Sequence, residues 1–100
     1  MAALGEIVEK VRSKNAGPFW LTVDIFCGSP AAFVQVRDSL STDRVAAALG
    51  AEIADVKRFE IEDLNVVKFS LPRPVVQGDL RDRDLHGAGW AVLLAEMDLN

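Results

Sequence analysis

Apolar residues recur along the chain with two spacings, one of three or four residues and one of two residues. A helix brings every third or fourth side chain to the same side, whereas a strand alternates its side chains between two faces. The wider spacing predicts three helices, near residues 3–14, 30–39 and 42–50. The alternating spacing predicts four strands, near residues 20–26, 57–62, 66–71 and 92–98.

The first predicted helix depends on a single apolar stripe. Its members are spaced i, i+3, i+4 and i+7, and they are Leu4, Ile7, Val8 and Val11. Gly17 and Pro18 follow this segment and are residues that commonly end a helix. The second predicted helix begins with Ser29 as its N-cap before Pro30.

Two of the alternating segments flank a turn at residues 63–65, and this arrangement predicts a β-hairpin. Proline has no backbone N–H to donate to a ladder, so Pro72 and Pro74 are expected to end the second of these strands. Residues 75–89 are predicted to form a long loop.

The last apolar run fits both spacings. Alternation, which predicts a strand, is shown by Leu93, Ala95, Met97 and Leu99. Helical spacing is shown by Trp90, Leu93, Leu94 and Met97. We favour the strand over the helix.

The resulting order αβααβββ predicts an α+β fold, a compact single domain over residues 1–100 with a mostly antiparallel sheet packed against helices. A chain of 100 residues has the ordinary size of one domain, and half of its residues are hydrophobic, which is enough for one core. The residues expected in this core are Ile7, Val11, Leu21, Val23, Ile25, Phe33, Leu49, Phe59, Ile61, Phe69 and Leu71.

Composition narrows the classes of partner. The net charge of −4 disfavours nucleic acid, which requires a basic surface, and disfavours an anionic membrane surface for the same reason. The single cysteine, Cys27, excludes an internal disulfide and a cysteine-based zinc site, and we expect a buried, inert thiol. There is no apolar run near the ~20 residues of a membrane span and no signal-peptide pattern, so the expected location is the cytoplasm.

The segment Ser13-Lys14-Asn15-Ala16-Gly17-Pro18-Phe19 is the first candidate site. It offers an ammonium, an amide and a backbone that glycine allows close to a ligand, and together these could hold a carboxylate or phosphate. A helix C-terminus disfavours anions, however. The favoured interpretation is a helix stop followed by a turn.

A second candidate is the string Asp82-Arg83-Asp84-Leu85-His86, where two carboxylates and an imidazole share one side of an extended chain. Neighbouring arginines could neutralise these carboxylates, and a solvated loop without a metal is favoured. His86 is the only histidine and hence the one unperturbed general base near neutral pH, but a structural role is favoured for it as well. We expect no cofactor.

Arg73 lies between two prolines, which restrict its backbone to an extended conformation. A guanidinium held in this way suits carboxylate recognition. We therefore predict that Lys14, Asn15 and Arg73 border one polar patch. The carboxylate partner is either Asp24, which interrupts an otherwise apolar or β-branched strand, or an external ligand.

The residues quoted so far resemble a bacterial family of small domains of unknown function that is associated with acyclic terpene utilisation protein A (AtuA). The likeness runs along nearly the whole chain and is most specific over residues 13–19 and 21–25. Leu71-Pro72-Arg73-Pro74 and Gly87-Ala88 also match, whereas Cys27 and Trp90 depart from the pattern.

The resemblance implies a partner. Members of that family look like small companions of a larger AtuA-like protein, which is tied to the catabolism of acyclic terpenes and related branched acids through acyl-CoA intermediates. The leading hypothesis is therefore a non-catalytic small subunit that docks on this protein. One alternative is a small enzyme or a carboxylate- or acyl-CoA-binding protein that uses Lys14, Asn15, Arg73 and His86; another is a self-associating structural domain.

Three aromatic residues near the ends of predicted elements bear on association: Phe19, Trp20 and Trp90. Aromatic residues anchor many interfaces, and they also fill cores. We favour the core for all three, with a homo-oligomeric interface as the alternative.

Overall fold

The computed structural model describes residues 2–17, 19–73 and 90–99. Its α-helices are α1 (Leu4–Ile7), α2 (Pro30–Ser39), α3 (Thr42–Leu49) and α4 (Trp90–Ala95). Its strands are β1 (Lys10–Asn15), β2 (Trp20–Phe26), β3 (Lys57–Ile61) and β4 (Val66–Pro72). Two 3₁₀ turns, Ile53–Asp55 and Glu62–Leu64, lie on either side of β3.

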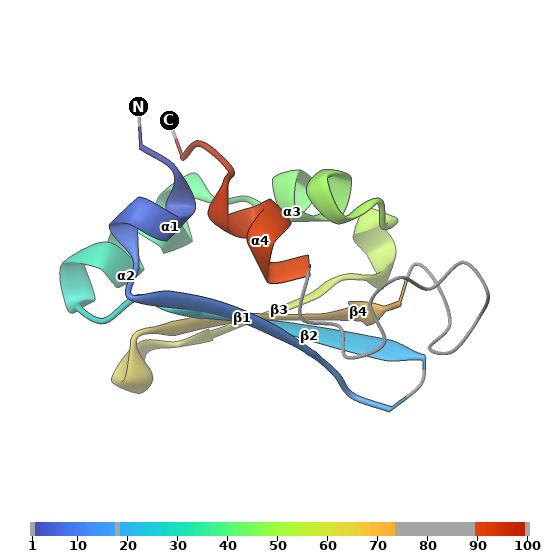
Figure 1. Ribbon diagram of the computed structural model, residues 1–100. Helices are drawn as coiled ribbons and strands as arrows, with labels where there is room; N and C mark the ends of the chain where they lie inside the picture. Colours follow the sequence, from blue (N-terminus) through green and yellow to red (C-terminus); the bar gives the residue numbers. More distant parts are fainter. Residues whose placement is uncertain (1, 18, 74–89, 100) are drawn as a thin grey trace.

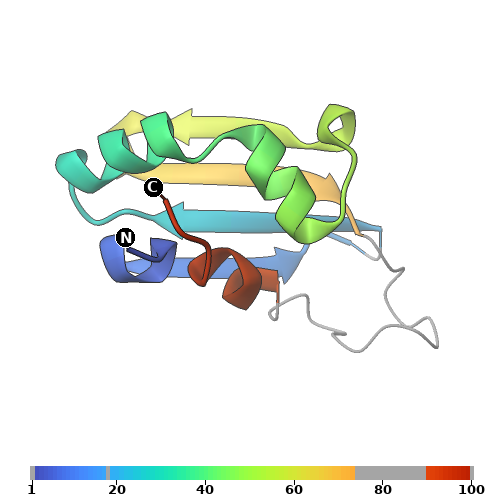
Figure 2. The ribbon, with the colours of Figure 1, turned by 90° about the horizontal axis from the view of Figure 1, so that it is seen from above.

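The strands form one antiparallel sheet with the order β1-β2-β4-β3. All four α-helices of the described residues lie over the same face of this sheet (Figures 1 and 2). An α+β fold with an antiparallel sheet packed against helices is therefore confirmed. The hairpin predicted around residues 63–65 is also found, because β3 pairs with β4 along its whole length.

The core lies between the sheet and the helices. Its central residues alternate along the two inner strands, and they are Leu21, Val23, Ile25, Val67, Phe69 and Leu71. The helices supply Phe33 and Leu49, as expected, and Leu94 of α4, which is fully buried. Ile7 and Val11 are partly buried and pack against this cluster.

The predicted helix over residues 3–14 is wrong beyond Ile7. α1 is a single turn, and the following residues Lys10–Asn15 form β1, an edge strand that pairs along its length with β2. The apolar stripe is a local signal. Pairing with a strand that lies next in sequence overrides it, because strand formation depends on neighbouring strands more than on the segment's own preferences.

The predicted C-terminal strand is also wrong. Residues Trp90–Ala95 form α4, and strand-like pairing near it is limited to one bridge between Ala3 and Asp98. The helix buries Ala91 and Leu94 on one side, which matches the helical spacing of this run rather than its alternation. The two ends of the described chain lie side by side (Figure 1), with the Leu4 amide donating to the Met97 carbonyl at 2.7 Å.

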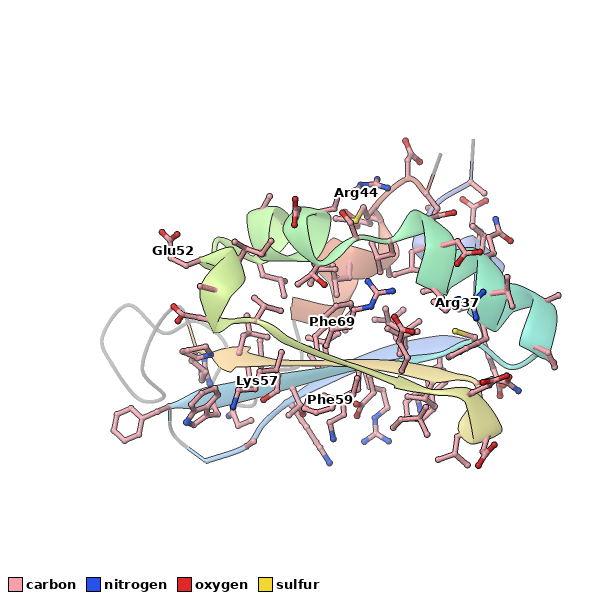
Figure 3. The ribbon with its side chains drawn as sticks, turned by 180° about the vertical axis from the view of Figure 1, so that it is seen from behind. Arg37, Arg44, Glu52, Lys57, Phe59 and Phe69 are labelled. Carbon is pink, nitrogen blue, oxygen red and sulfur yellow. The ribbon has the colours of Figure 1, made fainter. Side chains whose placement is uncertain are left out.

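Phe59 and Ile61 were expected in the core, and this is wrong for Phe59, which is 47% exposed, while Ile61 is only half-buried. Phe59 lies on the side of the sheet away from the helices (Figure 3). The opposite face of β3 presents Arg58 to the helix layer, where its guanidinium lies 5.6 Å from the centre of the Phe69 ring. The alternation of side chains along β3 was predicted correctly, but the choice of which side chains face the core was wrong.

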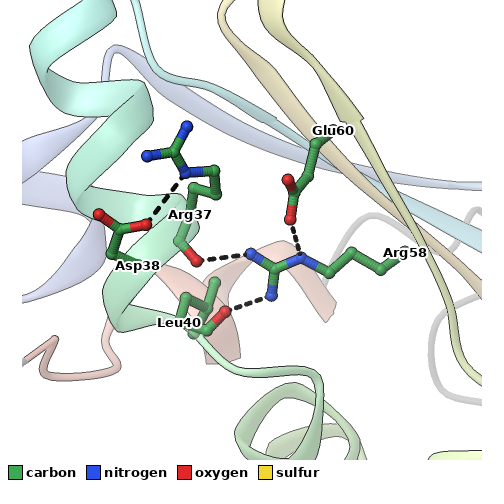
Figure 4. Close-up of polar contacts among 5 residues, drawn as sticks. All are labelled: Arg37, Asp38, Leu40, Arg58 and Glu60. Atoms are coloured by element: carbon green, nitrogen blue, oxygen red, sulfur yellow. Dashed lines mark hydrogen bonds and ion pairs between the residues drawn. The ribbon is translucent and has the colours of Figure 1, made fainter.

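Arg58 explains this orientation (Figure 4). Its Nη2 donates to the Arg37 carbonyl at 2.9 Å, and its Nη1 donates to the Leu40 carbonyl, both at the C-terminal end of α2. Its Nε donates to Oε2 of Glu60 at 2.8 Å. The last carbonyls of a helix have no partner within the helix, so a cation that bonds to them stabilises its end.

Candidate functional site

Ser13 has a structural place in the fold. It lies on the helix side of β1, where its side chain is buried and its Oγ accepts a hydrogen bond from the Ala91 amide at 2.9 Å. That amide is in the first turn of α4 and has no acceptor within the helix. Ser13 thus fixes the start of α4 against the sheet.

Asn15 and Arg73 meet at the end of the sheet, as predicted. Arg73 Nη1 donates to Asn15 Oδ1 at 2.5 Å, and the Arg73 amide donates to the Phe19 carbonyl at 2.8 Å. Arg73 is only 7% exposed although it carries a charge. A hollow of about 210 Å³ beside it is lined by Gly50, Ala51, Glu52, Asp55, Pro72 and Arg73. Two carboxylates in this lining disfavour an anionic ligand there.

Lys14 and Asp24 lie away from the contact between Asn15 and Arg73. Lys14 lies on the other face of the sheet, because side chains alternate along β1. Asp24 lies on that same face, where its Oδ1 forms an ion pair with Lys68 Nζ at 4.0 Å. The predicted patch of Lys14, Asn15 and Arg73 is therefore divided between two faces, and Asp24 has a lysine beside it instead of Arg73.

The remaining candidates stand apart. Gly17 is in the turn between β1 and β2 with a φ of 83°, a conformation that favours glycine. His86, with Asp82 and Asp84, lies outside the described residues. Among the side chains that are described, no group of three or more histidine, cysteine, aspartate or glutamate residues could hold a metal ion.

The sequence did not predict the most distinctive surface of the molecule, the face of the sheet that no described helix covers, which we call the open face. Three rows of side chains cross it, each with one residue from β1, β2, β4 and β3 in that order. The first row is Lys14, Thr22, Ser70 and Lys57; the second is Arg12, Asp24, Lys68 and Phe59; the third is Lys10, Phe26, Val66 and Ile61. Trp20 and Pro72 extend the face beyond the first row.

The open face differs in charge from the rest of the chain. It carries five cations and one carboxylate, hence +4, whereas the whole chain carries −4, so the other residues together carry −8. It also exposes large rings, with Trp20 41% and Phe59 47% exposed. The favoured placement of Phe19 and Trp20 in the core is wrong, because both are exposed. The Trp90 side chain is outside the described parts.

Two details of the open face set it apart from an ordinary solvated sheet surface. Thr22 is 7% exposed, and its Oγ1 is buried without a hydrogen-bond partner in the described structure. At the other end, a hollow of about 280 Å³ is lined by Glu9, Lys10, Arg12, Phe26, Gly28 and Leu64. Buried polar groups are nearly always hydrogen-bonded, so the Thr22 hydroxyl is an exception that a bound group would remove.

A sequence signal for this face existed. Lys10, Arg12 and Lys14 are two residues apart, which places them on one side of a strand. A helix would instead distribute them around its circumference, so the prediction of a helix over residues 3–14 concealed the basic row. None of the helices in the described ranges has the length and apolar character that crossing a membrane requires.

Comparison with known proteins identifies one relationship. No curated protein and no solved structure matches the chain. The model of a domain family of unknown function, DUF4387, matches residues 4–98, which include every helix and strand described above. The chain therefore belongs to the DUF4387 family.

Proposed function

We propose that this chain is a small, non-catalytic accessory subunit that docks on a larger AtuA-like metabolic protein in the catabolism of acyclic terpenes and related branched acids. One observation carries the proposal: the helices of the described residues all lie on one face of the sheet, and the open face combines exposed rings with cations. An antiparallel sheet commonly turns one polar face to water, and eight of the twelve residues in the three rows are polar or charged; what sets the open face apart is that large rings are exposed among its cations.

The composition of the open face is that of an interface. Aromatic residues and arginine are enriched where proteins bind one another, and the residues that contribute most to binding are often tryptophan or arginine. Trp20, Phe59 and Arg12 supply these types from three different strands. Because strands of one sheet hold one another in register, the side chains are presented on a rigid support, which lowers the entropic cost of binding.

The identity of the partner rests on the sequence. The segments Ser13–Phe19 and Leu21–Ile25, together with Leu71–Pro74, resemble small companions of AtuA-like proteins. Most of these residues form the β1–β2 hairpin and the end of β4, which lie next to each other at the end of the sheet that carries Trp20. The resemblance is therefore strongest at one edge of the proposed docking surface.

Co-expression with the AtuA-like protein of the same genome tests the proposal. We expect the two chains to co-elute in size-exclusion chromatography, with a light-scattering mass equal to the sum of whole-number copies of both. Separate elution of the two proteins would contradict the proposal. Binding of a short-chain acyl-CoA by the isolated chain, with no response to the large protein, would instead favour a stand-alone binding protein.

A further inference from the structure

We propose that the open face recognises an acidic surface of its protein partner, with the partner's carboxylates over the first two rows and an apolar side chain in the hollow beside the third row. This inference rests on the proposed function, and it adds the face, the chemistry of the partner and the orientation in which the two bind.

The charge of the open face favours an acidic partner. The six charged residues of the open face sum to +4 in a chain of net charge −4. Asp24 is the one carboxylate in the three rows; it forms an ion pair with Lys68 and lies opposite Arg12 in the pairing of β1 with β2. Charges arranged in this way attract a complementary negative surface and repel a positive one, which fixes both the partner and its register. An entirely apolar partner would leave these cations without water or counter-charge.

The first row specifies where a carboxylate would bind. Lys14 and Lys57 stand at its two ends, on the outer strands, and the hydroxyls of Thr22 and Ser70 lie between them on the inner strands. Thr22 Oγ1 is the buried hydroxyl without a described partner. A hydroxyl can donate to a carboxylate oxygen, and a hydrogen bond to an ionised acceptor is stronger than one between neutral groups. The Ser70 hydroxyl is half-buried at the centre of the row, the buried Thr22 hydroxyl becomes reachable to a bound carboxylate when the neighbouring side chains shift, and positive charge stands on both sides.

The third row specifies an apolar contact. Phe26 and Leu64 form the apolar wall of the hollow of about 280 Å³, whose other lining residues include Glu9, Lys10 and Arg12, and this volume is enough to hold a side chain whose charged surroundings lie at its rim. The turn that follows β3 carries Glu62 and Asp63 at this end of the sheet. Those carboxylates repel acidic groups of a partner, so they direct them toward the first row, at the opposite end. The two ends of the open face therefore differ in charge, so the partner can bind in one orientation.

Two other occupants present some of the same chemistry. Proteins that bind single-stranded nucleic acid also present cations and aromatic rings to it. Asp24 in the middle of the face and the net charge of −4 disfavour it. A second copy of this chain carries its excess of negative charge outside the open face, so it would have to bind head to tail, which does not close into a symmetric dimer.

The test compares two variants with the same change in net charge. Lys14→Gln with Lys57→Gln removes two charges from the first row, and Ala31→Glu with Gln35→Glu adds two negative charges on the exposed side of α2. We expect the first variant to bind the AtuA-like protein about tenfold more weakly at about 50 mM salt, with a smaller loss at about 300 mM, because salt screens charges. The second variant should bind within about twofold of the unmodified chain.

Thr22→Val provides an independent arm. It keeps the shape of the side chain and removes only the hydroxyl, which has no described partner in the fold. We expect weaker binding with an unchanged or higher unfolding midpoint. A structural role for this hydroxyl would lower the midpoint instead.

Each remaining outcome has a definite meaning. If the unmodified chain forms no complex, the proposed function and this inference both fail. If it forms a complex that both charge variants and Thr22→Val leave intact, or if both charge variants weaken it equally, only the inference fails. Two other results would overturn the inference. If the chain binds an oligothymidine and Lys14→Gln with Lys57→Gln abolishes that binding, the open face binds nucleic acid. If light scattering shows a dimer that this variant dissociates, the open face binds a second copy of the chain.

Discussion

At the scale of single residues, Arg58 joins β3 to the end of α2 through the carbonyls of Arg37 and Leu40. Replacing it with alanine leaves these carbonyls and Glu60 without their donor. We expect Arg58→Ala to lower the free energy of unfolding by about 2–3 kcal/mol in urea denaturation, since bonds with a charged donor are stronger than neutral ones.

A matched control lies on α2. The Arg37 side chain forms an exposed ion pair with Asp38 and lies near the exposed carboxylates of Glu60 and Glu62, and such surface pairs contribute little, so Arg37→Ala should leave the unfolding midpoint nearly unchanged. Equal effects of the two substitutions would show that the carbonyl contacts of Arg58 do not stabilise the helix end.

Cys27 gives a prediction about pH. Burial raises the pKa of its thiol above the ordinary value, because the thiolate is poorly solvated there. In the unfolded chain the thiol ionises at a lower pH, so its contribution to stability is complete below about pH 8.5 and is lost as the pH rises toward the folded pKa.

Urea unfolding below and above about pH 8.5 tests this contribution. We expect the free energy of unfolding to fall with rising pH more steeply in the unmodified chain than in Cys27→Ala, which lacks the thiol. A thiol reagent should also react with the folded chain much more slowly than with the urea-unfolded chain. Parallel pH dependences of the two proteins would contradict the prediction.

At the scale of elements, what could be predicted depended on whether the signal was local. The α2 helix and the β3–β4 hairpin carry their own start and turn residues, Ser29 before Pro30 and Asp63-Leu64-Asn65, and both were predicted correctly. β1 has no such signal, because two of its helix-side residues, Ser13 and Asn15, are polar. They are satisfied by Ala91 and Arg73, which are remote in sequence.

The candidate site was predictable to the same extent. Flanking prolines marked Arg73, and the structure places it against Asn15. The spacing of Lys10, Arg12 and Lys14 indicated one basic row, but the open face as a whole could not be predicted, because it depends on the order β1-β2-β4-β3, which brings cations from the two outer strands onto one surface. The spacing of residues within one segment does not indicate the order of the strands in the sheet.

The contact between α4 and β1 leads to a prediction for these elements. Ser13→Ala removes the acceptor of the Ala91 amide, which is then buried without a partner. We expect a loss of about 1–2 kcal/mol in stability and faster hydrogen exchange in residues 90–95 than in α2, because the start of α4 is no longer held. Ser13→Thr, which keeps a hydroxyl, is the control. Unchanged exchange in Ser13→Ala would show that packing alone holds α4.

At the scale of the whole molecule, one core is completed by segments from both ends of the chain. Leu4 of α1 and Leu94 of α4 are fully buried in the cluster that contains the centre of the sheet. Arg44 of α3 adds a link to the C-terminal segment by donating to the Asp98 carbonyl. Loss of α4 should therefore destabilise the sheet itself, since its apolar face loses part of its cover.

Two substitutions in α4 measure how strongly this helix is coupled to the rest of the molecule. Leu94→Ala removes a fully buried side chain and should lower the free energy of unfolding by about 2–5 kcal/mol, whereas Val92, on the same helix, is 55% exposed, and Val92→Ala should change it by less than about 0.5 kcal/mol. If the core is a single cooperative unit, circular dichroism and the fluorescence of Trp20 on the open face should report the same shifted urea transition for Leu94→Ala, with both proteins carrying Trp90→Phe because α4 contains the other tryptophan. A transition in helical signal that precedes the change at Trp20 would show that α4 unfolds on its own and that the sheet keeps its structure without it.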